Sequence, residues 1–148
     1  MSIVSMIFGM FCIYMAKYRD LNDLGYSSIH VNAFTLMRIM LIYGALQLAL
    51  GSTFFLTCSV TSIAIRRGQK WGARIIVGLF GTFFYLCLVV VTIIAGIIGF
   101  YQVMQMYSQV DYVDVSLESY IDQTFYRCAI VVFSFHIWFS VSKCCCCR

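Results

Sequence analysis

The chain has 148 residues, of which 62% are hydrophobic and 11% are charged, and it contains no proline. Soluble domains carry roughly one-quarter charged residues, so this composition argues against a soluble fold and predicts a single membrane-embedded domain over residues 1–148. The net charge of +4 comes from residues in short loops, without a basic patch that has interleaved aromatic residues. A nucleic-acid partner is therefore not expected.

Four apolar segments predict an all-α fold, an integral membrane bundle of four transmembrane helices. They cover about 3–18, 39–65, 75–106 and 127–142. A helix needs about 20 residues to cross a hydrocarbon core of about 30 Å, and the second and third segments are longer than that. The first and fourth are shorter, and we expect Tyr18, Phe125 and Tyr126 to extend them at the membrane interface. In the alternative, the first segment lies in the interface without crossing.

The short connection over 66–74 is basic, and its charged residues are Arg66, Arg67, Lys70 and Arg74. Positively charged loops stay on the cytoplasmic side, so this inner loop predicts the orientation of the chain. With four spans, the N- and C-termini are then both cytoplasmic. The connections over 19–38 and 107–126 become outer loops.

Small residues in the second and third segments predict close helix packing. They include Ala45, Ala49, Gly78, Gly81, Ala95 and Gly99. Ala45 with Ala49, and Ala95 with Gly99, are small residues four apart on one helix face. We favour the interior of the bundle as the place of these residues, and a surface between copies of the chain is the alternative.

The second segment also carries Thr53, Thr57 and Thr61 at four-residue spacing. Such a stripe of hydroxyl groups could line a pore. Threonine in a helix more often donates to a backbone carbonyl one turn back, and we favour that interpretation here.

His136 lies near the middle of the fourth segment. An ionisable residue at membrane depth is a functional hypothesis by default, such as proton sensing or contact with a substrate. We favour a neutral imidazole bonded to a hydroxyl group. The expected partners are Ser134, Ser140 or a threonine of the second segment.

The segment between the third and fourth helices has two regular stripes, one acidic and one apolar. The acidic residues are Asp111, Asp114, Glu118 and Asp122, and the apolar residues are Val110, Val113, Leu117 and Ile121. Both spacings fit an amphipathic helix that lays its apolar stripe on the bundle. The acidic face is expected to be solvated, and attraction of cations or of a basic partner is the alternative. Calcium-loop spacing is absent, so no metal site is predicted.

The chain ends in SKCCCCR over 143–148, and four adjacent cysteines suit one modification better than others. Zinc ligands need pairs of cysteines separated by about two to four residues, neighbouring cysteines make strained disulfides, and a prenylation signal needs aliphatic residues. Juxtamembrane cysteines at a cytoplasmic helix end are typical of S-palmitoylation. We therefore predict lipidation of Cys144, Cys145, Cys146 and Cys147 in a eukaryotic membrane protein, with unmodified or metal-binding thiols as alternatives.

The other four cysteines are Cys12, Cys58, Cys87 and Cys128. Each is isolated in an apolar segment, so we expect them to be buried as small hydrophobic residues. A disulfide between Cys12 and Cys128 is a less favoured alternative.

The sequence GALQLALG in the second segment, followed by RRGQKWGAR, fits a helical hairpin with a short inner loop. With four spans, small outer loops and a cysteine-rich end, the whole chain resembles the small tetraspan membrane proteins, including the MARVEL-type and membrane-spanning four-domain families. The resemblance concerns topology, and it transfers no functional residue. The Cys-Cys-Gly outer loop of true tetraspanins and the outer-loop tryptophan and cysteine pair of claudins are absent.

Paired carboxylates, a histidine–cysteine catalytic arrangement and a phosphate-binding loop are all missing, so no catalytic residue and no cofactor is expected. We predict a non-enzymatic organiser or regulator of membrane proteins, in the plasma membrane more than in internal membranes. Its expected partners are the lipid bilayer and other membrane proteins or copies of itself. The alternative is a small oligomeric channel or transporter that uses the hydroxyl stripe and His136, and an intramembrane enzyme is third.

Overall fold

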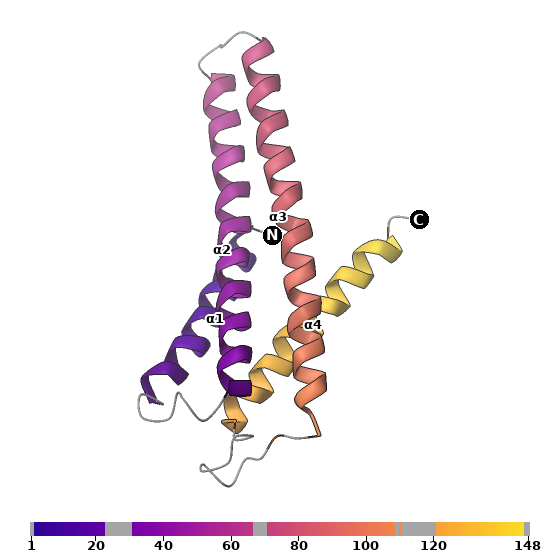
Figure 1. The fold of residues 1–148 in the computed structure, drawn as a ribbon. Helices are drawn as coiled ribbons and strands as arrows, with labels where there is room; N and C mark the ends of the chain where they lie inside the picture. Colours follow the sequence, from indigo (N-terminus) through magenta and orange to yellow (C-terminus); the bar gives the residue numbers. More distant parts are fainter. Residues whose placement is uncertain (1, 23–30, 67–70, 109, 111–120, 147–148) are drawn as a thin grey trace.

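The computed structural model describes residues 2–22, 31–66, 71–108, 110 and 121–146, and these ranges contain four α-helices (Figure 1). The helices are α1 (Ser2–Asn22), α2 (Val31–Arg66), α3 (Trp71–Met106) and α4 (Gln123–Cys146). Each predicted apolar segment lies inside one helix. The all-α class is confirmed.

Two of the helices are long and apolar enough to cross a membrane. Their apolar stretches are Phe34–Ile63 in α2 and Ile75–Met106 in α3, and α1 has a shorter one, Ile3–Lys17. An α-helix rises about 1.5 Å per residue, so the two long stretches measure about 45 and 48 Å. Both are longer than a hydrocarbon core, which is about 30 Å thick. Their length and composition are compatible with membrane spans.

The helices alternate in direction along the chain (Figure 1). α2 and α3 form a long antiparallel hairpin, α1 packs along α2, and α4 packs on α3 while it inclines away from the hairpin. The connection between α2 and α3 has only four residues between the two helix ends, which favours antiparallel neighbours.

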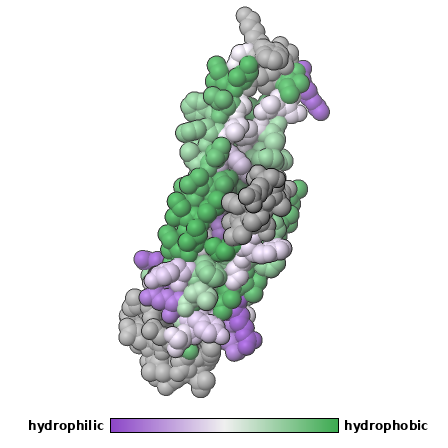
Figure 2. Space-filling model, turned by 90° about the vertical axis from the view of Figure 1, so that its right-hand side faces the viewer, coloured by the Kyte–Doolittle hydropathy of each residue, from purple (hydrophilic) through white to green (hydrophobic). Residues whose placement is uncertain are grey.

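The buried core lies in the half of the hairpin that α1 and α4 flank. It contains Cys12, Leu36, Met40, Tyr43, Val103, Met106, Ile121, Phe125, Tyr126, Ala129, Val132 and Phe133. Large apolar side chains elsewhere face outward, with Phe80 on α3 the most exposed at 75%. Figure 2 shows one face on which apolar residues cover the middle and hydrophilic residues gather mostly toward the ends. The described surface is thus largely apolar.

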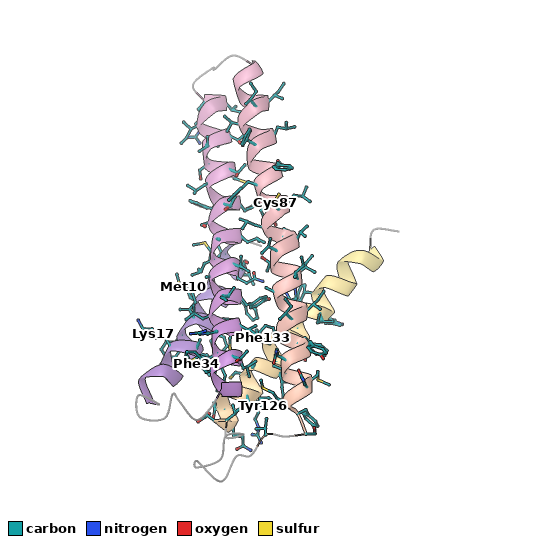
Figure 3. The ribbon with its side chains drawn as sticks, in the orientation of Figure 1. Met10, Lys17, Phe34, Cys87, Tyr126 and Phe133 are labelled. Carbon is teal, nitrogen blue, oxygen red and sulfur yellow. The ribbon has the colours of Figure 1, made fainter. Side chains whose placement is uncertain are left out.

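The start of α4 lies in the buried core. From the sequence we expected its aromatic residues at the membrane interface. Phe125 and Tyr126 are 3% and 1% exposed, and the Tyr126 hydroxyl donates to the carbonyl oxygen of Val103 on α3 at 2.7 Å. Figure 3 labels Tyr126 near the beginning of α4. Both rings pack inward because α4 begins at Gln123, so its first turns already face α3.

One member of the predicted acidic face caps α4. A carboxylate oxygen of Asp122 accepts from the backbone N–H groups of Thr124 at 2.8 Å and Phe125 at 3.0 Å, the geometry of a helix N-cap. Ile121 beside it is buried, and Val110 packs against the core. Asp111, Asp114 and Glu118 lie outside the described residues, and so does most of the predicted amphipathic helix.

Candidate functional site: a hydrogen-bonded chain across three helices

His136 of α4 bonds to Tyr43 of α2. The Nδ1 atom of His136 lies 2.7 Å from the Tyr43 hydroxyl oxygen, and the two rings meet edge to face with centroids 5.2 Å apart. Tyr43 is 1% exposed, and the centroid of its ring lies 5.4 Å from that of the Phe133 ring. The bond therefore joins α2 and α4 inside the core.

The chain of bonds continues to α1. Gln47, one turn after Tyr43 on α2, donates its amide N–H to the Tyr43 hydroxyl oxygen at 2.9 Å. The hydroxyl of Ser5 on α1 donates to the Gln47 side-chain carbonyl at 2.5 Å and lies 3.2 Å from its backbone carbonyl. If the imidazole is neutral with its proton on Nε2, all these bonds run in one direction, from Ser5 to His136.

Two glycines of α3 make room for the rings of α4. A Cβ atom built on Gly96 would overlap Cδ2 and Nε2 of His136, and one built on Gly99 would overlap the ring of Phe133. Both glycines are buried. The absence of a side chain at these positions therefore sets how deeply His136 and Phe133 reach toward α3.

α1 approaches α2 at a pair of glycines. A Cβ built on Gly9 would lie 2.7 Å from the carbonyl oxygen of Gly44, and one built on Gly44 would lie 2.9 Å from the carbonyl oxygen of Gly9. The helices thus meet backbone to backbone, as small residues allow in a bundle. This crossing lies one turn from Ser5 and Gln47, so it brings the two side chains within bonding distance.

The predicted small residues do not all contribute to packing. Gly81 faces Thr57, where a built Cβ would be 2.6 Å from the threonine methyl carbon, and Gly99 and Ala95 lie against α4 or the core. Ala49 is half-buried, but Ala45 is exposed and a Cβ on Gly78 would meet no described atom within 4 Å. The interior placement is wrong for Ala45, because the crossing with α1 uses the neighbouring Gly44, and Gly78 has open space where a side chain would lie.

The hydroxyl stripe of α2 bonds to its own helix. Thr57 donates to the carbonyl of Thr53 at 2.8 Å, and Thr61 donates to the carbonyl of Thr57 at 2.7 Å. Thr92, buried in α3, likewise donates to the carbonyl of Leu88 at 2.7 Å. The prediction of back-bonding one turn earlier is confirmed for Thr57 and Thr61.

Tyr43 and Ser5 were not predicted. A hydroxyl partner for His136 was expected, and the structure provides one in Tyr43, a residue that was not considered. The available signal was the spacing of Tyr43 and Gln47, four residues apart and hence on one face of α2. The crossing of α1, which brings in Ser5, depends on Gly9 and could not be inferred from α2.

The cysteines inside the helices differ in burial. Cys12 is buried and Cys128 is half-buried, and both are free thiols. Cys58 and Cys87 are exposed, so their predicted burial is wrong; they lie on parts of α2 and α3 that α1 and α4 do not cover (Figure 3 labels Cys87).

Most residues of the predicted inner loop and tail lie outside the part of the chain that the structure describes. Arg66 is exposed in the last turn of α2. Arg67, Lys70 and Cys147 lie outside the described residues. The structure describes only the backbone, which is helical, for Arg74 in α3 and for Cys144, Cys145 and Cys146 in α4.

No protein-family model matches the sequence, and neither curated proteins nor solved structures give a match. Function is therefore inferred from this chain's own residues. Chemically, the described site can hold three helices in one register through directed bonds between neutral groups.

We expect Tyr43 and His136 to be energetically coupled. Tyr43→Phe keeps the ring and removes the hydroxyl, and His136→Leu removes the acceptor. Hydrogen bonds between membrane helices contribute about 0.6 kcal/mol on average and up to about 1.7 kcal/mol, so the coupling should fall in that range. It is measured by a double-mutant cycle on the free energy of unfolding in micelles.

Two further variants make this cycle specific. His136→Asn, whose amide oxygen can accept near the Nδ1 position, should restore part of the stability lost in His136→Leu. Tyr101→Phe removes a hydroxyl from a tyrosine that is 65% exposed on α3, and it should change little. Additive effects of Tyr43→Phe and His136→Leu would contradict the coupling.

Proposed function

We propose that the chain is a non-enzymatic multi-pass membrane protein that organises or regulates other proteins in a eukaryotic membrane. In this proposal four helices cross the bilayer, both termini are cytoplasmic, and the cysteine tail is S-palmitoylated. The plasma membrane is its expected location, and its partners are the bilayer and other membrane proteins or further copies of the chain. The topology-level resemblance to small tetraspan proteins is in keeping with this proposal.

The observation that carries the proposal is the distribution of polar and apolar side chains. Large apolar residues face outward on all four helices, whereas the hydroxyl and amide groups of Ser5, Tyr43 and Gln47 bond to one another or to His136 in the interior. In lipid, polar groups need internal partners and apolar groups do not need burial. This distribution suits a bundle surrounded by acyl chains.

The interior contacts favour a structural role over the channel alternative. The hydroxyls of Thr57 and Thr61 bond to α2 itself, and Thr57 packs against Gly81. His136 is bonded to Tyr43 and its ring lies against Gly96. The threonine hydroxyls are thus used within α2, and His136 joins α4 to α2, which supports a rigid unit that other proteins can contact.

Insertion of a glycosylation acceptor tests the topology. The sequence has no Asn-x-Ser/Thr site of its own, so an inserted site reports without background. Acceptors placed within 23–30 or 111–120 should be glycosylated, and one placed within 67–70 should not. Glycosylation at 67–70, or release of the protein from membranes by alkaline carbonate, would contradict the proposal.

Two further experiments address function and the tail. Flux through proteoliposomes that disappears in Thr57→Leu or His136→Leu would overturn the organiser hypothesis and favour the channel. Substrate turnover that depends on His136 would overturn it and favour an enzyme. Thioester-specific acyl exchange should give a signal with the natural chain and none with serine at Cys144 through Cys147.

A further inference from the structure

The hairpin of α2 and α3 carries outward-facing apolar side chains along almost its whole length. On α3 this surface runs from Ile75, which is 54% exposed, through Phe80 at 75% to Met104 at 53%. Met104 follows Ile75 by 29 residues, so the surface is about 44 Å long. α2 and α3 extend beyond the ends of both α1 and α4 (Figure 1). In that part of the hairpin the apolar surface belongs to α2 and α3 alone.

Exposed cations stand at both ends of the matching stretch of α2. Arg38 and Arg66 are exposed, and none of the 27 residues between them is charged. The rise from one to the other is about 42 Å. The guanidinium carbon of Arg38 lies 4.2 Å from the ring centroid of Phe34, one turn nearer the start of α2, so this cation points away from the uncharged stretch. Cations placed in this way complement the phosphate groups on the two faces of a bilayer.

The threonines beyond α1 and α4 donate to the helices that carry them. Thr57 and Thr61 bond one turn back on α2, and Thr82 donates to the carbonyl oxygen of Gly78 on α3 at 2.8 Å. These hydroxyl donors are therefore used without a partner from outside the hairpin. In a bilayer, a helix surface needs its polar groups satisfied internally. Acyl chains are the occupant that this surface suits.

The length of the surface distinguishes thick bilayers from thin ones. A helix longer than the hydrocarbon core fits by tilting, and helix tilts in membranes range up to about 40°. A stretch of about 42 Å needs a tilt of about 50° in a core of about 27 Å, the thickness in the endoplasmic reticulum. It needs about 38° in a core of about 33 Å, the thickness in a sterol-rich plasma membrane. Only the thicker core keeps the hairpin within the usual range of tilt.

We propose that the exposed surface of the hairpin binds bilayers with a thick hydrocarbon core in preference to thin ones. This rests on the proposed function, in which α2 and α3 cross a membrane. The occupant of the surface is long acyl chains, and phosphate groups meet Arg38 and Arg66 at its two ends. The mismatch between helix and bilayer decreases as the core thickens, so the hairpin itself favours the plasma membrane over thinner internal membranes.

Quenching of tryptophan fluorescence by brominated lipids tests this preference. Trp138 is 63% exposed on α4 and reports lipid at the surface of the bundle. Full-length protein is placed in phosphatidylcholine vesicles, and the relative binding of brominated lipids is measured for chains of about 14 to about 24 carbons. Binding should rise at least about three-fold from the shortest chain to one of about 22 carbons. Equal binding at all lengths, or strongest binding of the shortest chain, would overturn the proposal.

Two arginines placed inside the apolar surface should shorten the preferred chain. Val60 and Leu79 are 45% and 71% exposed, and they lie at a similar height because Thr57 faces Gly81. Val60→Arg with Leu79→Arg leaves about 33 Å between the cations of α2. The strongest binding should therefore move to lipids with fewer carbons.

The matched control adds the same two charges outside the apolar surface. Gln69→Arg with Gly72→Arg places them between Arg66 and Arg74, and a Cβ on Gly72 meets no described atom within 4 Å. This double variant should keep the chain-length preference of the natural protein. Equal shifts in the two double variants would show that the length of the apolar surface does not set the preference, and the proposal would fail.

Extraction with alkaline carbonate separates this proposal from the proposed function. Release of the natural chain from membranes would overturn both, because the hairpin would then not cross a bilayer. A chain that resists extraction but binds lipids of every length equally would overturn the thickness preference alone. Resistance to extraction together with stronger binding of long chains supports both.

Discussion

Gly96→Ala should disrupt the packing of α4 against α3. The added methyl group would overlap the imidazole of His136, and the ring can turn away only by giving up its bond to Tyr43. Overpacking of an interior costs about 1–3 kcal/mol, so a loss of that size is expected in the free energy of unfolding in micelles. The loss should exceed the gain of up to about 1 kcal/mol that alanine brings to a helix relative to glycine.

Two comparisons make this result specific to His136. Gly78→Ala, on the same helix, adds its methyl group where no described atom lies within 4 Å, and it should leave stability unchanged or slightly raised. In a His136→Ala background the space at Gly96 is vacated, so Gly96→Ala should become nearly harmless. Equal effects of Gly96→Ala with and without His136 would show that the ring is not what fills this space.

Gly9→Ala should have the largest effect on α1. Its methyl group would lie 2.7 Å from the carbonyl oxygen of Gly44 and 2.9 Å from the backbone nitrogen of Leu48. Backbone atoms cannot rotate out of the way, so the two helices must move apart, and Ser5 then loses its contacts with Gln47. We expect a cost at or above about 3 kcal/mol, the upper end for overpacking.

The control for this crossing is Gly72→Ala. Gly72 lies near the start of α3, and a Cβ there meets no described atom within 4 Å. Unfolding in micelles should show a large loss for Gly9→Ala and Gly44→Ala and almost none for Gly72→Ala. A Gly9→Ala protein as stable as Gly72→Ala would contradict the backbone contact between α1 and α2.

The class of fold could be predicted from the sequence because long apolar runs and short polar connections depend on local composition. The back-bonding of Thr57 and Thr61 was also predictable, since each threonine finds its acceptor one turn earlier on the same helix. Such features need no knowledge of how the helices are placed relative to one another.

The site could be predicted only in part, because its members lie far apart in the sequence. His136 was singled out as an ionisable residue in an apolar segment, but its partner is 93 residues away. Which hydroxyl it meets depends on how far Gly96 and Gly99 let α4 approach α3. Ala45 and Gly44 differ by only one position, yet the angle of α1 decides that Gly44 is the one in contact.

The short link between α2 and α3 also bears on the order of assembly. The two helices are adjacent in sequence and joined by four residues, so their contacts close small loops and carry little entropic cost. The bond from His136 to Tyr43 closes a much longer loop, and contacts of that kind form late. We therefore expect the long hairpin to form first and the contact of His136 with Gly96 to form last.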